Sequence, residues 1–405
     1  MLIEHLSRQL RERDAQSLRR HRRVVEGPCS PRGRVSNAGG DERPMLAFCS
    51  NDYLGLASHP AVVAALAGGA HRWGAGSGAS HLISGHSRAH AALEADLAQW
   101  LAPCFSRAKA LSFCTGYMAN LALLTTLGDS QATIFADKLN HASLIDGALL
   151  AKAPMQRYPH GRVDLLRSQL ERCDTPIKLI VTDAVFSMDG DLAPLPELLA
   201  LAERFDAWLI VDDAHGFGVL GAQGRGTLSH FGLSSERFIY MGTLGKAAGV
   251  GGAFVIAHPT VIEWLIQAAR TYVYTTAAPP AVAHAALKSL TLIRGDEGDQ
   301  RRAKLTALID MLRKRVGELI AAQPSLGWKL ADSTTAIQPL IVGDNDAVLA
   351  LSTSLESQGL WVPAIRPPTV PVGSARLRIT LSAAHSGEDV LRLVGGLEHA
   401  MRVLR

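Results

Sequence analysis

A lysine and an aspartate, each at the end of a short apolar segment, are the residues of this chain best suited to chemistry. Lys246 lies in the glycine-flanked turn 243–249, directly after the apolar run 238–241. A lysine amine forms Schiff bases when burial or neighbouring charges suppress its protonation. Asp212 ends another apolar run, residues 208–211. Together they meet the minimal requirement for pyridoxal phosphate (PLP), because the lysine binds the aldehyde and the acid keeps the ring nitrogen protonated.

Five small or polar residues occupy the same kind of position, directly after an apolar, strand-like segment. They are Gly116, Ser187, Asp212, His215 and Lys246. In open α/β sheets, ligands bind beyond the carboxyl ends of the strands. We therefore predict that these residues meet at one edge of a sheet.

Four further segments suit parts of a ligand site. Residues 115–120 follow a strand-like run and open a helix, whose free N–H groups are a natural phosphate site. The small-residue loop 74–80 is either a surface turn or a close backbone approach to a ligand. His141 is either structural or stacks on a planar ring. Arg366, in a proline-rich segment, forms either a surface salt bridge or a bidentate contact with a carboxylate.

Other chemistries fit the same residues less well. Asp212, Asp213 and His215 are possible metal ligands, but no second cluster completes a coordination shell, so no metal site is predicted. A triad with Ser187 as nucleophile lacks the nucleophile elbow of hydrolases. The glycine pattern at 216–221 neither follows a strand directly nor opens a helix, which disfavours a dinucleotide site. A cofactor-free hydrolase and a non-catalytic binding module remain the alternatives from other classes.

The elements that must position these residues are short apolar segments separated by helical stretches. Such segments, apolar on both faces, are typical of a parallel sheet covered by helices. The strand-like segments are residues 110–114, 133–136, 179–182, 208–211, 238–241 and 253–257. A proline and an apolar stripe predict a helix over 196–205.

The chain divides into three parts. Residues 1–45 are predicted to be an amphipathic helix (1–25) followed by a linker rich in Gly, Pro, Arg and Ser, and 46–284 a large domain. A smaller α/β domain is expected over 285–405, with a long helical stretch at 281–325. Its strands are predicted at 336–342, 360–362 and 377–381. The alternation within 377–381 predicts a sheet with one solvent-exposed face.

Bulk properties exclude several classes of protein. The 405 residues carry a formal net charge of +4, spread along the chain, which does not indicate nucleic-acid binding. The arginine cluster Arg19, Arg20, Arg22 and Arg23 is expected on the solvated face of the first helix, or at an anionic substrate or carrier. The five cysteines form no CxxC pair, which favours reduced thiols in the cytoplasm. Neither a signal sequence nor a run of about 20 apolar residues indicates a membrane.

These segments together resemble the α-oxoamine synthase family of PLP enzymes. The likeness runs almost end to end, from residues 50–56 (SNDYLGL) to 376–385 (RLRITLSAAH). It implies an α/β fold of the PLP-dependent aminotransferase type (fold type I). That fold has a large domain with a mostly parallel seven-stranded sheet and a smaller C-terminal α/β domain. It also implies a homodimer with the active site at the subunit interface.

The resemblance assigns roles to individual residues. Lys246 resembles the Schiff-base lysine and general base, Asp212 the partner of the ring nitrogen, and His141 a stacking residue and proton donor. Other cofactor contacts are implied for Gly116, Tyr117, Ser187, His215, Thr243 and, serving the neighbouring subunit, Thr275. Substrate contacts are implied for Arg366 (amino-acid carboxylate), Thr369 and Arg19 (acyl substrate).

The C-terminal segments narrow the reaction that the resemblance implies. Residues 336–345 and 364–371 are most similar to members that condense L-alanine with a pimeloyl thioester in biotin biosynthesis. The acyl donor is then pimeloyl-CoA or pimeloyl-acyl carrier protein. The alternative is the sister reaction of glycine with acetyl-CoA, which gives 2-amino-3-ketobutyrate.

Overall fold

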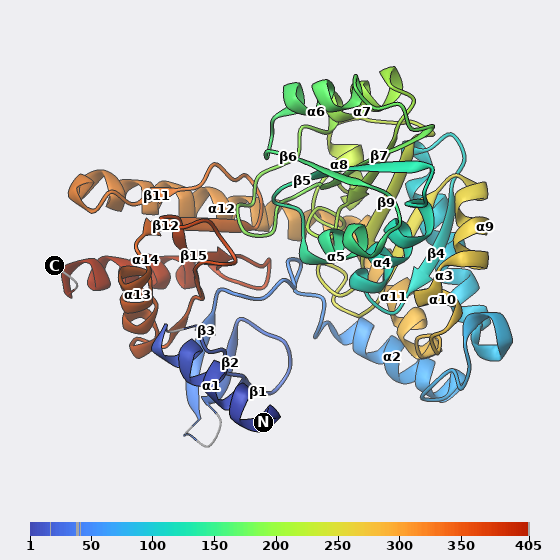
Figure 1. The fold of residues 1–405 in the computed structure, drawn as a ribbon. Coiled ribbons are helices and arrows are strands. Elements are labelled where there is room, and N and C mark those ends of the chain that lie inside the picture. Colours follow the sequence, from blue (N-terminus) through green and yellow to red (C-terminus); the bar gives the residue numbers. More distant parts are fainter. Residues whose placement is uncertain (17, 38–39, 41, 404–405) are drawn as a thin grey trace.

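The computed structural model describes residues 1–16, 18–37, 40 and 42–403, and a seven-stranded sheet forms the centre of its larger part (Figure 1). The strand order is β4-β10-β9-β8-β7-β5-β6. The strands are β4 (Lys109–Phe113), β5 (Ala132–Asp137), β6 (Met155–Tyr158), β7 (Ile177–Asp183), β8 (Trp208–Asp212), β9 (Phe238–Thr243) and β10 (Ala253–Ala257). Only β10 runs antiparallel to its neighbours, so the mostly parallel sheet is confirmed.

All six predicted strands of this sheet are present, and β6 is the strand that the sequence pattern missed. β6 lies at the sheet edge, and two of its four residues are exposed. It therefore lacks the continuous apolar run that marks a strand buried on both faces. The central strands do show that run, because successive residues such as Ile134 and Phe135 enter different core clusters.

Helices cover both faces of the sheet. Residues of α4 (Gly116–Leu127), α5 (Ala142–Leu150), α9 (Pro259–Ala268) and α10 (Arg270–Val273) pack in one core cluster. Residues of α3 (Arg88–Leu101), α6 (Val163–Leu170), α7 (Leu195–Arg204), α8 (Thr227–His230) and α11 (Pro280–Arg294) pack in the other. α2 (Pro60–Trp73) packs on α11, and a π-helical turn (His81–Gly85) leads into α3. Shorter 3-10 turns lie at Ala102–Cys104 and Ala222–Gly224.

The C-terminal part is a smaller α/β unit. The expected helical stretch 281–325 is two helices, α11 and α12 (Asp296–Ala322), separated at Gly295, and a 3-10 turn (Pro324–Leu326) follows. The antiparallel sheet β11-β12-β15-β14 comprises β11 (Lys329–Leu330), β12 (Ile337–Gly343), β15 (Ala375–Thr380) and β14 (Ala364–Ile365). α13 (Asn345–Ser357) and α14 (Gly387–Val403) complete it.

The predicted linker over 26–45 is wrong, because half of it is sheet. After α1 (Leu2–Ala15), the strands β1 (Arg23–Glu26), β2 (Arg32–Asn37) and β3 (Arg43–Ala47) pair antiparallel. β13 (Leu360–Trp361) adds to β3 in parallel, so this predicted C-terminal strand does not join the small-domain sheet. A sheet with solvated faces needs few apolar residues, which is why the composition resembled a linker. Residues 38–39 and 41 of this range lie outside the described residues.

The prediction that β15 has one solvent-exposed face is also wrong. All its residues are buried, Arg376 and Arg378 included. Arg378 Nε donates to the Ser187 carbonyl at 2.6 Å, and Arg376 donates to the Met188 carbonyl at 3.1 Å. The polar side chains of β15 therefore face the large domain, where hydrogen bonds to protein groups replace those to water. Among the described residues, no helix combines the length and the apolar character needed to cross a membrane.

Candidate active site

The cavity at the carboxyl edge of the large sheet brings together most of the predicted site residues. It has a volume of about 190 Å³. Its lining comprises Gly116, Tyr117, Asn120, His141, Ser143, Asp183, Asp212, Ala214, His215, Met241, Thr243 and Lys246. Four of the five residues expected to meet do so here. Ser187 lies instead in an adjoining cavity, of which His141 is the shared wall.

Lys246 is held in the turn that follows β9. Within this turn, Leu244 N donates to the Gly252 carbonyl at 2.9 Å, and Gly249 N donates to the Lys246 carbonyl at 2.8 Å. The Lys246 Nζ lies 2.8 Å from His215 Nε2. Burial lowers the pKa of Lys246 to about 8. A substantial fraction of the amine is therefore neutral near physiological pH, and the neutral amine is the nucleophilic form.

A hydrogen-bonded chain behind Lys246 orients His215. His215 Nδ1 lies 2.5 Å from the Tyr53 hydroxyl, which is 3.1 Å from Asn51 Oδ1. Burial and the Lys246 charge hold the pKa of His215 well below its usual value, so the ring is neutral. Because Asn51 Oδ1 only accepts, His215 Nδ1–H donates to Tyr53 and Nε2 is left to accept from Lys246.

The acid Asp212 is buried and held from two sides. Its Oδ2 accepts from Asn120 Nδ2 at 2.7 Å, and its Oδ1 accepts from Ala214 N at 3.0 Å. Asp183 stands opposite it on β7. Burial, and then the charge of Asp212, raises the pKa of Asp183 well above its usual value. Ionisation of Asp183 is therefore disfavoured beside Asp212.

The adjacent Asp213 has a different role. It is buried, and its Oδ2 accepts from Thr227 N at 2.7 Å and from the Tyr240 hydroxyl at 2.8 Å. Burial raises the pKa of Asp213 to about 7. Since these partners lie on α8 and β9, Asp213 anchors the glycine-rich turn after β8, and the cavity is left to Asp212.

His141 caps α5 at the mouth of the cavity. Its Nδ1 accepts from Ser143 N at 3.3 Å and lies 2.8 Å from Ser143 Oγ. Its backbone N–H donates to Asp183 Oδ2 at 2.6 Å. Desolvation lowers the pKa of His141, so the ring that lines the cavity is neutral at pH 7.

Sequence reasoning missed four residues of this constellation: Asn51, Tyr53, Asn120 and Asp183. Asp183 also ends an apolar run, which is the signal that selected Asp212. Asn120 lies in the segment 115–120, and the other two lie in 50–56. Their segments stood out, but only the fold shows which side chains reach the site.

The donor set fits PLP. A nucleophilic amine of lowered pKa and a buried carboxylate line one cavity with the start of α4 at Gly116. At the start of α4, Thr115 Oγ1 accepts from Met118 N. The N–H groups of Gly116 and Tyr117, which precede Met118 in the helix, are the ones that suit a phosphate. The Oδ1 of Asn120 is buried beside Asp212 without a hydrogen-bond partner among the described residues. The structure therefore offers a group for the aldehyde, the ring nitrogen and the phosphate.

The predicted substrate residues lie beyond His141, around the proline-rich segment. Ser187 and Thr369 line a cavity of about 660 Å³. Arg366 and Thr369 line another of about 320 Å³, together with Arg19 and Arg20. The three predicted substrate contacts therefore share one region.

The arginine cluster does not lie on the first helix, because α1 ends at Ala15. It follows α1 and lines a cavity of about 910 Å³ with Arg366 and Trp361. Arg19 is bonded to Asp14 Oδ2 at 2.6 Å. That contact lies within the N-terminal arm, whereas Arg23 joins the arm to the C-terminal part by donating to Glu356 Oε2 at 2.6 Å. Thr275 lies after α10 and is not among the residues that line these four cavities.

The small-residue loop 74–80 packs on the segment after α10. Ser77 Oγ donates to the Ala278 carbonyl at 2.6 Å, and Ala277 N donates to the Ala79 carbonyl at 3.0 Å. These contacts are intramolecular and lie outside the cavity at the sheet edge, which favours the surface-turn interpretation of the loop within one subunit.

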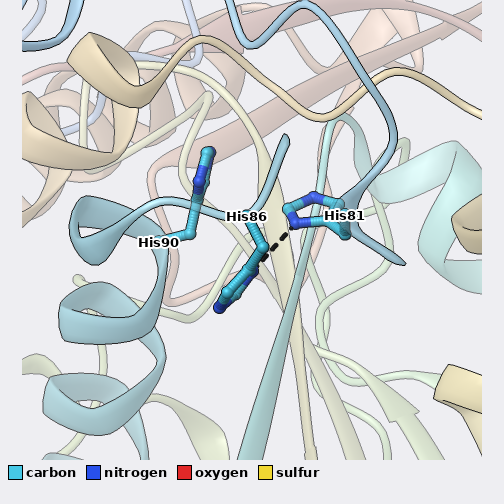
Figure 2. A group of neighbouring side chains, drawn as sticks. All are labelled: His81, His86 and His90. Carbon is cyan, nitrogen blue, oxygen red and sulfur yellow. Dashed lines mark hydrogen bonds between the residues drawn. The ribbon is translucent and has the colours of Figure 1, made fainter. Parts of the chain in front are cut away.

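Three histidines lie together where this loop meets α3 (Figure 2). The Nδ1 atoms of His81 and His86 are 3.0 Å apart. Both ring nitrogens of His90 have protein partners, since Nδ1 accepts from Ser87 N at 3.1 Å and Nε2 lies 2.8 Å from the Ala278 carbonyl. Two imidazoles thus remain as ligands, and we assign no metal site to the cluster.

Comparisons with known proteins agree with this geometry. Residues 43–397 match the family model "Aminotransferase class I and II". An 8-amino-7-oxononanoate synthase of Polaromonas naphthalenivorans (strain CJ2) is 74% identical over 400 residues, covering 99% of this chain and 98% of that protein.

Two solved structures are similar over most of their length. A serine palmitoyltransferase from S. paucimobilis with bound PLP and myriocin has a TM-score of 0.88 at 28% identity, covering 99% of this chain and 97% of that one. An 8-amino-7-oxononanoate synthase from Francisella tularensis has a TM-score of 0.74 at 30% identity, covering 89% and 98%.

Proposed function

Because this chain belongs to the aminotransferase class I and II family, we propose that it is a PLP-dependent acyltransferase of biotin biosynthesis. It condenses L-alanine with a pimeloyl thioester and releases 8-amino-7-oxononanoate, carbon dioxide and the free thiol carrier. The observation that carries this proposal is the Lys246 amine of lowered pKa in one cavity with the buried carboxylate of Asp212. The relative at 74% identity supports this substrate pair.

PLP, when bound, supplies an electron sink for the Cα carbanion of the amino acid. Lys246 would hold the PLP aldehyde and act as the general base for the Cα proton of the amino acid. Its lowered pKa suits this task, because a base poised near the working pH is most effective. Asp212, whose carboxylate accepts from Asn120 Nδ2 and Ala214 N, would hold the proton at the ring nitrogen. His215 keeps its acceptor nitrogen toward Lys246 through its bond to Tyr53.

The substrate groups bind on the other side of His141. Arg366 binds the alanine carboxylate, with Thr369 beside it on the same stiff segment. His141, which lines both cavities, would contact the PLP ring and donate a proton to the thioester carbonyl oxygen. Ser187 and Thr243 complete the contacts, and Arg19 meets the acyl substrate. Closing these groups around both substrates orients the thioester for attack.

The acyl carrier is coenzyme A or acyl carrier protein, since the arginines near Arg366 suit the anionic groups of either. The active form in this proposal is a homodimer in which Thr275 serves the neighbouring subunit. Tyr274 and Ile83 have exposed side chains. Tyr274 lies just before Ala277, which donates to the Ala79 carbonyl, and Ile83 follows Ala79 by four residues. Exposed apolar side chains on both sides of this contact support an interface there. The five free cysteines support action in the reducing cytoplasm.

Product analysis with competing substrates tests the proposal. Purified protein reconstituted with PLP is given alanine with pimeloyl-CoA, alanine with pimeloyl-acyl carrier protein, or glycine with acetyl-CoA. Mass spectrometry should detect 8-amino-7-oxononanoate in at least one of the first two reactions. Product only from glycine and acetyl-CoA would instead identify the sister reaction.

A further inference from the structure

His160, which the reaction scheme leaves unused, lies between carboxylates from two different loops. Its Nδ1 is 3.2 Å from both oxygens of Asp137, and its Nε2 is 2.8 Å from Asp191 Oδ2. The imidazole packs edge-on against Phe186, with ring centroids 4.3 Å apart. A single side chain that follows β6 therefore joins the end of β5 to Asp191, eight residues beyond the end of β7.

The first of these loops carries His141. Asp137 ends β5, and its Oδ1 also accepts from Leu139 N at 2.8 Å. Asn140 Nδ2 donates to the Val181 carbonyl at 2.9 Å, and His141 caps α5 directly afterwards. Asp137 thus lies four residues before His141, in a segment that these hydrogen bonds hold in place.

The second loop carries Ser187. Phe186 N donates to the Asp191 carbonyl at 3.0 Å, which closes the turn 186–191. The small domain holds the same turn through the bond from Arg378 to the Ser187 carbonyl. Both loops line the cavity of about 660 Å³ that also contains Thr369. His160 therefore joins two segments that each supply a wall of this cavity.

The charge of His160 is needed for this bridge. Since each ring nitrogen faces a carboxylate, both must donate, and only the imidazolium ion has two donors. Hydrogen bonds to Asp137 and Asp191 raise the pKa of His160 to about 10. Neighbouring cations on the same segment are directed elsewhere, because Arg157 donates to the Lys138 carbonyl and Arg162 pairs with Asp164.

We propose that the His160 cation is a positioning residue for the condensation: it holds the His141 loop and the Ser187 loop at the separation that the acyl thioester requires. This inference rests on the proposed function for its catalytic consequence. It assigns His160 to the substrate side of the site, because Lys246, Asp212 and Gly116 line the other cavity and His141 is the residue common to both.

Two near-isosteric variants test the bridge in the PLP-loaded enzyme. In His160→Asn the amide nitrogen replaces Nδ1, and in His160→Gln it replaces Nε2, so each keeps one bond and neither keeps the charge. We expect both to lower kcat/KM for the acyl thioester by about tenfold or more while the PLP dissociation constant stays within about threefold. His71→Gln, the same change at an exposed histidine of α2, is the matched control and should behave as wild type.

Each outcome decides the matter. Wild-type kcat/KM in both variants overturns the proposal, and so does a parallel loss of PLP affinity and thermal stability, which would mark a purely structural role. Nitrogen NMR of histidine-labelled protein at pH 8 gives a readout independent of turnover. It should show His160 protonated at both nitrogens, and a neutral ring would refute the bridge. An inactive wild type with a doubly protonated His160 would count against the proposed reaction alone.

Discussion

The cofactor cavity and the substrate region of this protein are built by opposite means. In the cofactor cavity, Asp212, Asp183 and His215 are buried at strand ends or directly after them, and their side chains have fixed partners. Around Arg366, the walls come from an N-terminal arm and a coil segment, and their arginines are largely solvent-accessible. Buried, satisfied groups are preorganised, whereas exposed arginines are ordered by the ligand. Cofactor chemistry thus rests on buried groups, and substrate capture on half-buried or exposed arginines.

The largest expected effect is at Lys246. Lys246→Ala removes both the aldehyde-binding amine and the general base, so turnover should fall by at least about 10⁴-fold. The visible band of the bound cofactor should no longer be fixed by borohydride reduction, while the circular dichroism spectrum stays unchanged. Lys152→Ala, at an exposed lysine, is the control. Substantial activity in Lys246→Ala would contradict the assignment of Lys246 as the residue that binds the aldehyde and acts as the base.

Asp212→Ala should be nearly as damaging. Without a carboxylate at the ring nitrogen the electron sink fails, and we expect kcat to fall by about 10³-fold. Asn120→Ala, which only removes a hydrogen bond to Asp212, should cost about tenfold. Steady-state kinetics of the pair measures how far the buried network itself contributes. A larger loss in Asn120→Ala than in Asp212→Ala would contradict the assignment.

Arg366→Ala probes the other region. Losing a bidentate partner for the alanine carboxylate should raise the KM for alanine by roughly 30-fold. The PLP dissociation constant should not change, because Arg366 does not line the cofactor cavity. Arg366→Lys should recover only part of the loss, since lysine cannot form the planar fork. Weakened PLP binding in these variants would show that the two regions are not separate.

A pH profile sharpens the description of the buried side. Lysine attacks as the neutral amine, and burial lowers the pKa of Lys246 to about 8. The rate at which the apoenzyme binds PLP covalently should therefore rise with pH below that value and level off above it. Stopped-flow absorbance measures this rate directly. A rate still climbing at pH 10 would mean that Lys246 titrates like an exposed lysine.

Arg19→Ala should have the smallest effect. Its side chain is 41% exposed and already paired with Asp14, and exposed ion pairs contribute about 1 kcal/mol or less. We expect a rise of about threefold in the KM for the acyl thioester, which diminishes at high salt. Arg162→Ala, in an exposed pair that lines none of these cavities, is the control. An effect as large as that of Arg366→Ala would place Arg19 in the preorganised part of the site.

The order of the large-domain strands along the chain, and the polar residues that end them, were predictable from local pattern. Each central strand is apolar on both faces, so its end is marked where a polar or small residue such as Asp212 or Gly116 follows. The ends of neighbouring parallel strands meet at one edge, and this rule brought Lys246, His215 and Asp212 together before any coordinates. The rule wrongly placed Ser187 in the same cavity as Lys246. Ser187 lines the adjoining cavity, because the turn 186–191 extends beyond β7.

Contacts between distant segments could not be predicted from pattern. The alternation in β15 indicated a solvated face, yet Arg376 and Arg378 point into the large domain. Likewise, nothing local shows that Tyr53 reaches His215 or that His160 joins two loops. The sequence around an arginine or a histidine is the same whether its side chain is hydrogen-bonded to water or to a carboxylate.

By itself, the amino-acid sequence determined where strands end, which helix opens on the phosphate position, and which lysine and aspartate have the chemistry for PLP. Tertiary structure alone decided their protonation and their partners. The pairing of Asp183 with Asp212 and the burial of Lys246 arise only when separate strands pack side by side. The physical reason is that backbone periodicity is a local property, whereas desolvation and charge coupling depend on everything that surrounds a group in space.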